Sequence, residues 1–325
     1  MGEEEVEKTE GVALPVERCA EYRRQLIFVI YICTPNFKIV MKHIIVPYDF
    51  SDEARNGIAL ARVLATQTLA DIQLVYVQRK QPDFAHLSLA EERKLVESEF
   101  QNLLAEITPT LPQGVKIDYI IKKGKVYQEV VAQADAFNES VIVTSTHGAS
   151  GFEEFFLGSN TLKILSSTEV PVYTIRHGIV PVPLRDIIFP LDTTFESRQK
   201  APVVVKLAKQ WGATVHIVTT TDGYDAEEIK KLQAYIAQCE EYFVKNDVMY
   251  VTYRAEREDF IYVITAYASK LPSSLVTITT RDKSVPSFFM IGEKAQRLLR
   301  KSPVPVLVVV PTLVRITDSF RTQGA

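Results

Sequence analysis

An internal repeat constrains the fold of this 325-residue sequence more than any other feature. The segment KHIIVPYDFSDEAR at residues 42–55 returns as RDIIFPLDTTFESR at residues 185–198, a spacing of 143 residues. Near the end of each copy the spacing becomes 134 residues. Identities at the first spacing occur at Ile44, Ile45, Pro47, Asp49, Glu53, Arg55, Leu64, Ala65, Gln67 and Ala70, and at the second at Phe155, Gly158, Leu165, Val170, Pro171 and Val172. Identities at a constant spacing indicate a tandem duplication.

Each copy alternates short apolar runs with amphipathic stretches. In the first copy the apolar runs are HIIVPYD, DIQLVYV, VKIDYIIKKG, SVIVTSTHG and VPVYTIR. The pattern between them predicts helices at Ser51–Thr66, Ser88–Ile107, Val126–Phe137 and Ser159–Ser167. Strands that alternate with helices imply right-handed crossovers and a parallel sheet covered on both faces. We therefore predict an α/β protein with two tandem Rossmann-like units, each a mainly parallel five-stranded sheet with helices on both faces.

The register of the repeat predicts the domain organisation. Residues 41–176 form the first unit, 177–184 a linker and 185–311 a second, degenerate unit, followed by a tail at 312–325. Residues 1–40 precede the repeat, and we interpret them as an N-terminal extension or an upstream start. Their apolar run LIFVIYIC is too short to span a bilayer, and the acidic beginning is unlike a signal peptide.

Charge and cysteine content argue against several classes of protein. The net charge is −3 without a long block of one sign, so we expect neither a nucleic-acid partner nor a membrane partner. Cys19, Cys33 and Cys239 form no CxxC or metal-ligand pattern, which argues against a disulfide framework and a zinc site. This cysteine usage fits a reducing cytoplasm.

Two loops of the first unit are candidates for a ligand site, because ligands of such sheets bind beyond the carboxyl ends of the strands. The first loop is PYDFSDEA, in which Ser51 or Asp52 can cap the following helix. Asp49 lies at the end of the strand and can accept hydrogen bonds from a base or a ribose. A turn-capping role for Asp49 and nothing more is the alternative.

The second loop is STHGASGFEEFFLGSN at residues 145–160. Gly148 and Gly151 give its backbone freedom to turn or to approach a ligand closely. The helix that begins at Gly158 and Ser159 offers unpaired N–H groups and a positive dipole end to phosphate oxygens. The loop is an anion site in principle, although glycine is also common at strand–helix junctions and Ser159 can act as an N-cap.

These motifs together resemble the universal stress protein family. The resemblance rests on VPYD followed by serine, and on a late strand followed by glycine, nine residues, Gly-Ser and a closing VPVYTIR. It covers Lys42–Arg176 and, less fully, Arg185–Val310. It implies an adenine-nucleotide-binding-like fold. One branch of the family binds ATP through three spaced glycines: two residues separate the first from the second, nine separate the second from the third, and serine or threonine follows the third. The other branch lacks this pattern and does not bind ATP.

The resemblance assigns candidate residues position by position. Gly148, Gly158 and Ser159 match the ATP pattern, but Ser145 stands where the pattern has its first glycine. A serine there adds a Cβ that can crowd the ligand and a hydroxyl that can donate to a phosphate oxygen. The predicted residues for binding ATP, which brings its own Mg²⁺, are Pro47, Asp49, Val77, Thr144, Ser145, Gly148, Gly158, Ser159 and Asn160.

The second unit departs further from the pattern. It keeps the aspartate as Asp192 but has Asp282 and Glu293 at the positions of Gly148 and Ser159. Each carboxylate at about 4 Å opposes a phosphate by ~1 kcal/mol in water and by several in a partly dry site. We expect that the second site does not bind ATP.

The sequence offers little sign of catalysis. His147 has no serine, cysteine or carboxylate visibly spaced to form a triad with it, and we interpret Glu153 and Glu154 as solvated loop residues. We interpret the charged stretch Glu91–Glu99 as a solvated helix face. Slow ATP hydrolysis is the most activity that we expect.

The preferred function is that of a cytoplasmic, stress-associated protein whose first unit binds ATP in a regulatory role. The alternative is a tandem scaffold or interaction protein of the same fold that binds no ATP. Relatives pair their closing strands across a two-fold axis, so VPVYTI and VPVLVVV are expected to pair within this chain. The chain would then be an internal pseudo-dimer, and a further homo-oligomer is left open.

Overall fold

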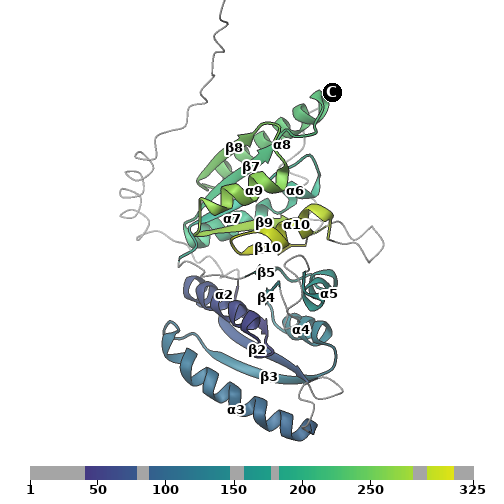
Figure 1. Ribbon diagram of the computed structural model, residues 1–325. Coiled ribbons are helices and arrows are strands. Elements are labelled where there is room, and N and C mark those ends of the chain that lie inside the picture. Colours follow the sequence, from purple (N-terminus) through teal and green to yellow (C-terminus); the bar gives the residue numbers. More distant parts are fainter. Residues whose placement is uncertain (1–40, 79–87, 147–156, 177–182, 281–290, 311–325) are drawn as a thin grey trace, which may run out of the picture. The chain divides into compact units, whose positions relative to one another are not determined.

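The computed structural model describes residues 41–78, 88–146, 157–176, 183–280 and 291–310 (Figure 1). The first half contains β1 (His43–Pro47), α2 (Asp52–Thr68), β2 (Asp71–Gln78), α3 (Leu89–Ile107), β3 (Ile117–Lys123), α4 (Val126–Asp135), β4 (Ser140–Ser145), α5 (Ser159–Ser167) and β5 (Val172–Ile175). The second half contains β6 (Asp186–Pro190), α6 (Glu196–Gln199), α7 (Ala201–Trp211), β7 (Thr214–Thr220), α8 (Ala226–Lys245), β8 (Tyr250–Ala255), α9 (Phe260–Ser269), β9 (Ser274–Thr279), α10 (Glu293–Lys301) and β10 (Val306–Val309). The predicted alternation of strands and helices is confirmed.

The described strands form one ten-stranded sheet in the order β3-β2-β1-β4-β5-β10-β9-β6-β7-β8. Within each half all the strand pairs are parallel, and both halves have the same order, with the first strand between the second and the fourth. The closing strands β5 and β10 pair antiparallel, with Val172 opposite Val308. The predicted fold class, two Rossmann-like units with mainly parallel five-stranded sheets, is confirmed.

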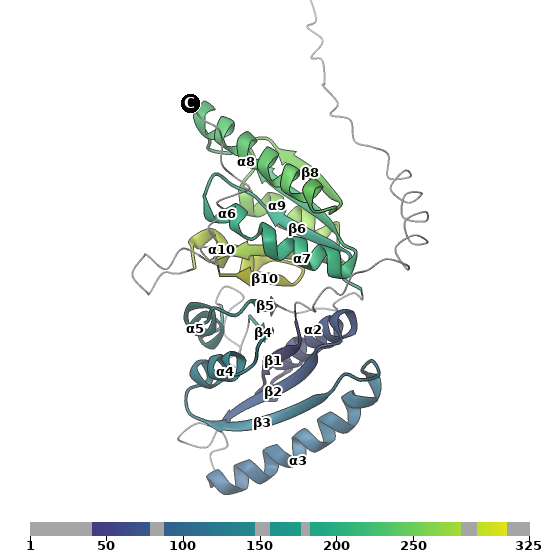
Figure 2. The same cartoon turned by 180° about the vertical axis from the view of Figure 1, so that it is seen from behind.

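Helices cover both faces of the sheet (Figures 1 and 2). One hydrophobic cluster joins the sheet to α2, α3, α7 and α8, and a second cluster joins the other face to α4, α5, α9 and α10. The inner strands are therefore buried on both sides, which explains why they read as nearly continuous apolar runs in the sequence, whereas the outer strands β3 and β8 are partly exposed.

The interpretation of Glu91–Glu99 as a solvated helix face is wrong at Glu92 and Val96. Glu92 is fully buried, and its carboxylate accepts hydrogen bonds from the Tyr76 hydroxyl at 2.7 Å and the Gln78 side-chain amide at 3.0 Å. Glu92 belongs to the inward stripe of α3, four residues before Val96 and eight before Phe100, both of which are buried. The helical period therefore decides its place, and two hydrogen bonds satisfy its carboxylate.

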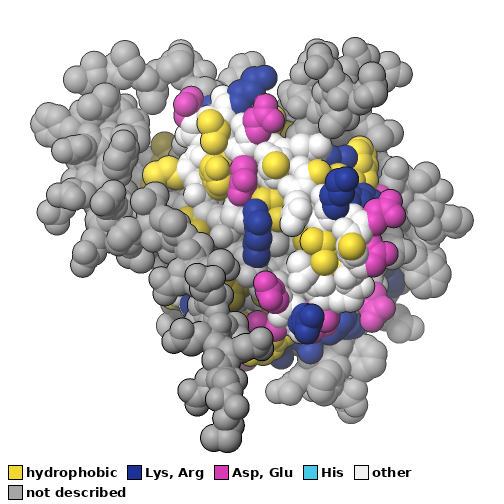
Figure 3. All heavy atoms as spheres, turned by 90° about the horizontal axis from the view of Figure 1, so that it is seen from above, with side chains coloured by type: hydrophobic (Ala, Val, Ile, Leu, Met, Phe, Trp, Pro, Cys, Tyr) yellow, Lys and Arg dark blue, Asp and Glu magenta, His cyan; other side chains and the backbone are white. Residues whose placement is uncertain are grey.

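The surface shown in Figure 3 carries lysine and arginine side chains interspersed with aspartate and glutamate, and some hydrophobic side chains between them. This mixture agrees with the net charge of −3 and with the absence of long blocks of one sign in the sequence. Of the helices in the described ranges, none has the length and apolar character needed to cross a membrane.

The two halves end their first long helix differently. The C-cap residue of α2 is Leu69, which adopts a left-handed backbone with φ of 58°. The C-cap residue of α7 is its counterpart in the repeat, Gly212, with φ of 60°. Glycine adopts this conformation without the steric cost that a Cβ imposes. The Leu69 side chain is 60% exposed, so it contributes little packing that would offset this cost.

We predict that Leu69→Gly stabilises the protein by roughly 0.5–1 kcal/mol, since it removes the left-handed strain. Gly212→Ala should destabilise it by about 1 kcal/mol, because the new Cβ meets no neighbouring atom within 4 Å and adds only backbone strain. Urea unfolding of both variants measures these changes. Leu69→Ala is the matched control and should bring no comparable gain; a loss of stability in Leu69→Gly would contradict the explanation.

Candidate functional site

Sheet topology places the predicted site at the carboxyl edge of the first half. From β1 the chain first adds β2 and β3 on one side and then β4 and β5 on the other, so strand order reverses between β1 and β4. Pro47 ends β1 and pairs with Val75 of β2, and Ile45 pairs with Ile142 of β4. Because these strands are parallel, Asp49, which follows β1, and Thr144 and Ser145, which end β4, lie at the same edge.

Asp49 is held in a tight turn directly after β1. Its Oδ1 accepts hydrogen bonds from the Ser51 amide at 3.2 Å and the Ser51 hydroxyl at 2.6 Å. Of the two predicted candidates, Ser51 is the N-cap of α2, because its hydroxyl oxygen accepts a hydrogen bond from the Ala54 amide at 3.2 Å. The turn-capping role of Asp49 is therefore present. The two hydrogen bonds from Ser51 use only Oδ1, and the Asp49 side chain is exposed.

Phe50 fixes the direction of this turn. Its backbone is left-handed with φ of 63°, an unfavourable state for a residue with a Cβ. Its ring lies 5.0 Å from the ring of Tyr48 and 4.8 Å from that of Phe100. Aromatic packing under α3 thus offsets the backbone strain and keeps the neighbouring Asp49 at the exposed edge.

The end of β4 and the start of α5 are joined by two short hydrogen bonds. The Thr161 hydroxyl donates to the Ser145 carbonyl at 2.7 Å, and the Gly158 amide donates to the Thr146 carbonyl at 2.7 Å. Gly158 is the N-cap of α5 and brings no side-chain cap. Since the first N–H groups of a helix lack intrahelical partners, the first turn of α5 is a donor surface beside β4.

The structure brings most of the described candidates to one edge. Ser159 and Asn160 open α5, and Ser159 is exposed. Val77 is different, because its side chain is buried in the apolar cluster that joins the sheet to α4. Val77 therefore contributes to the packing of β2. Gly148, like His147, Glu153, Glu154 and Asp282, lies outside the described residues.

Sequence reasoning missed two residues that shape this edge. Thr161 ties α5 to the Ser145 carbonyl, and the Thr161 hydroxyl also lies 3.4 Å from the Thr144 hydroxyl. Gly57 of α2 faces β4, and a Cβ added to it would lie 3.9 Å from both the Ser145 amide nitrogen and the Val143 carbonyl oxygen. A small residue at this position lets α2 approach the strand end closely. A comparison of the two copies could have identified the position, because the counterpart of Gly57 is the much larger Lys200.

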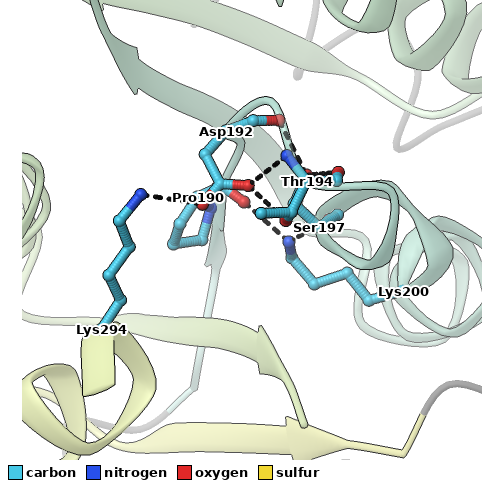
Figure 4. Close-up of polar contacts among 6 residues, drawn as sticks. All are labelled: Pro190, Asp192, Thr194, Ser197, Lys200 and Lys294. Atoms are coloured by element: carbon cyan, nitrogen blue, oxygen red, sulfur yellow. Dashed lines mark hydrogen bonds and ion pairs between the residues drawn. The ribbon is translucent and has the colours of Figure 1, made fainter. Parts of the chain in front are cut away.

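The corresponding edge of the second half encloses a pocket of ≈ 690 Å³. Asp192 repeats the turn of Asp49, because its Oδ1 accepts hydrogen bonds from the Thr194 amide at 2.9 Å and from the Thr194 hydroxyl (Figure 4). The Lys294 ammonium lies 3.2 Å from Asp192 Oδ2. Both oxygens of the Asp192 carboxylate therefore have partners within the protein.

Lys200 is buried beneath the same turn. It is 1% exposed, and its Nζ donates to the Pro190 carbonyl at 2.7 Å and to the Ser197 carbonyl (Figure 4). Burial lowers the pKa of Lys200 to about 8, although the nearby Asp192 carboxylate opposes this shift. Burial raises the pKa of Asp192, but hydrogen bonds from Thr194 and the charge of Lys294 outweigh burial and hold it below its usual value.

In the parts of the chain that the structure describes, no three histidine, cysteine, aspartate or glutamate residues are arranged to hold a metal ion. Cys239 is a free thiol buried in α8, and burial raises its pKa to about 12. This thiol is therefore protonated at neutral pH and is a poor nucleophile.

Comparison with protein-family models decides the identity of the first half. Residues 41–176 match the universal stress protein family. These residues are a universal stress protein domain. The resemblance drawn from the sequence is thereby confirmed, and a second domain-sized region with the same strand order follows, as in a tandem member.

Related proteins agree with this assignment. A universal stress protein of Thermus aquaticus is 26% identical over 140 residues, which cover 42% of this chain and 100% of the relative. A universal stress protein of Methanocaldococcus jannaschii is 27% identical over 159 residues, covering 43% of this chain and 97% of the relative. Each of these relatives therefore corresponds to less than half of the chain.

Solved structures extend the likeness of fold to both halves. A universal stress protein from Archaeoglobus fulgidus has a TM-score of 0.67 at 19% identity and covers 85% of this chain and 100% of its own. A protein described as a universal stress protein from Pseudomonas aeruginosa has a TM-score of 0.60 at 17% identity, covering 83% of this chain and 94% of its own. The two-unit universal stress protein fold is thus shared along most of the chain.

Lys200 gives the second half a distinctive pH dependence. Its pKa is about 8 in the folded protein against an ordinary 10.5, so between these values the unfolded chain binds more protons. Stability contributed by this group therefore rises with pH across the window. We predict that the parent protein gains up to roughly 3 kcal/mol relative to Lys200→Met as pH rises from 8 to 10.5.

Urea unfolding at several pH values within this window measures the difference between the two curves. Lys206→Met, which removes an exposed lysine of α7, is the control and should leave the pH dependence unchanged. Parallel curves for the parent and Lys200→Met would contradict a depressed pKa.

Proposed function

We propose that the first universal stress protein unit binds an adenine nucleotide, ATP with Mg²⁺, and that occupancy regulates the protein in the cytoplasm. The observation that carries this proposal is the shared edge. The exposed Asp49 turn and the uncapped start of α5 lie beyond the carboxyl ends of β1 and β4, where strand order reverses. An acceptor for the nucleoside and a donor surface for the phosphates therefore lie at the same edge of the sheet.

Each candidate residue has a role in this proposal. Asp49 Oδ2 accepts hydrogen bonds from the base or the ribose, because Ser51 engages only Oδ1. The first-turn N–H groups of α5 and the hydroxyl of Ser159 donate to phosphate oxygens. Ser145 borders the phosphates, and Gly148, outside the described residues, is assigned to them from the sequence pattern alone. The remaining residues are proposed to position these groups: Pro47 and Val77 from β1 and β2, Thr144 from β4 and Asn160 from α5.

The second candidate function is a scaffold that binds no ATP. It is favoured by Ser145, which replaces the first glycine of the ATP pattern and places a Cβ beside the ligand. The antiparallel pair of β5 and β10 supports the internal pseudo-dimer that either function would use. We retain the proposed boundaries, with units at 41–176 and 185–311, a linker at 177–184, and segments 1–40 and 312–325 outside the units.

Isothermal titration with Mg-ATP tests the assignment of the nucleotide to the first half. We predict one equivalent per chain. Gly158→Asp should weaken binding by at least about tenfold, because it places a carboxylate at the start of α5 where the phosphates bind. Aspartate is a favourable N-cap residue, so this variant is expected to fold.

The chain offers a matched control at Gly292, which is the N-cap of α10 and the counterpart of Gly158. Gly292→Asp introduces the same charge in the second half and should leave binding unchanged. Two equivalents per chain, or binding that is lost in Gly292→Asp and retained in Gly158→Asp, would show that the wrong half was assigned. An absence of binding to the parent at millimolar Mg-ATP would favour the scaffold.

A further inference from the structure

The two halves make the same aspartate turn but complete it differently. In the first half Asp49 Oδ1 binds the amide and hydroxyl of Ser51, and in the second Asp192 Oδ1 binds the same groups of Thr194. Within the described ranges no partner occupies Asp49 Oδ2, whereas Asp192 Oδ2 receives Lys294 at 3.2 Å. The difference therefore lies at the one carboxylate oxygen that the turn leaves available.

Lys294 reaches this oxygen from the second residue of α10. Its counterpart in the repeat is Asn160, the second residue of α5, whose side chain is shorter and uncharged. The Lys294 ammonium also lies 5.0 Å from the centre of the Phe260 ring, and both residues line the pocket. Lys294 is thus held from two sides, by a carboxylate and by an aromatic face.

A buried carboxylate needs a partner, and here the protein supplies it. Asp192 is 7% exposed, and an ionised carboxylate at that depth is costly unless it is paired. In the first half Asp49 is exposed, so water or a ligand can satisfy its second oxygen. The second half therefore does not depend on a ligand for the stability of this turn.

Lys200 reinforces the same arrangement. It stands where the first half has Gly57, and its ammonium ties the last carbonyl of β6, at Pro190, to the Ser197 carbonyl. The ammonium also lies 4.1 Å from the centre of the Phe189 ring. Two lysines, at positions where the first half has Gly57 and Asn160, thus hold the groups around the Asp192 turn in place.

We propose that Lys294 replaces a ligand in the second half. Its ammonium binds Asp192 Oδ2, the oxygen that corresponds to the one to which the hydroxyl or amine of a nucleoside donates on Asp49 of the first half. The pocket of the second half is closed to nucleosides for this reason, in addition to the repulsion between its carboxylates and phosphate. Lys294 is then a specificity-determining residue that makes the tandem protein asymmetric. The inference rests on the proposed function for the nucleoside contact of Asp49 and for the choice of adenosine as the probe.

Adenosine separates this effect from phosphate repulsion, because it carries no phosphate. The experiment is calorimetric titration of the full chain with adenosine in an Asp49→Asn background, which disables the first site. We expect no detectable binding with Lys294 present. Adding Lys294→Asn, the residue of the first half, should create one site per chain and tighten binding by at least about tenfold. Further addition of Asp192→Asn should remove that site.

Lys301→Asn, which removes an exposed lysine at the other end of α10, is the matched control and should not create a site. Lys294→Gln provides a second variant in case Lys294→Asn does not fold, and circular dichroism checks both. Adenosine binding at one equivalent in the Asp49→Asn protein, or a folded Lys294 variant that gains no binding, overturns the proposal. Because the first site is disabled throughout, failure of the parent to bind ATP does not affect this result.

Discussion

The parallel pairing of β1 with both β2 and β4 is the constraint on which the rest of the structure depends. It places the first strand of each half in the centre of its sheet and reverses strand order beside it. This geometry fixes where a ligand is proposed to bind, because the ends of β1 and β4 and the start of α5 come together at the carboxyl edge of the sheet. In the second half β6, β9 and α10 repeat the arrangement, so the two edges can be compared residue by residue.

That comparison shows two halves with the same strand order but different polar groups at the same edge. Both halves keep the strand order, the glycine N-cap before the last helix and the aspartate turn. They differ in the groups around the turn, where the second half has Lys200 and Lys294 in place of Gly57 and Asn160. Polar substitutions at a few positions convert an exposed acceptor into an internal ion pair while the packing of the sheet is retained.

The sequence predicted what depends on local pattern and missed what depends on contacts across the fold. Strand and helix ranges followed from periodicity. Ser51, one of the two residues considered as the cap of the first helix, is the N-cap of α2. Glu92 was misread because its charge was given more weight than its position on the inward stripe of α3. The tie between Lys294 and Asp192 joins residues 102 positions apart, which no local pattern reveals. Comparing the two copies position by position would have marked Lys294 as a difference, but not its partner.

The central claim is that this chain, whose first half is a universal stress protein domain, has one site for an adenine nucleotide and a second half in which Lys294 engages the corresponding aspartate. The most direct measurement is the adenine nucleotide released when the purified full-length protein, previously incubated with Mg-ATP and freed of unbound nucleotide, is denatured. The account predicts close to one equivalent per chain. Two equivalents would contradict closure of the second half, and none would contradict nucleotide binding by the first.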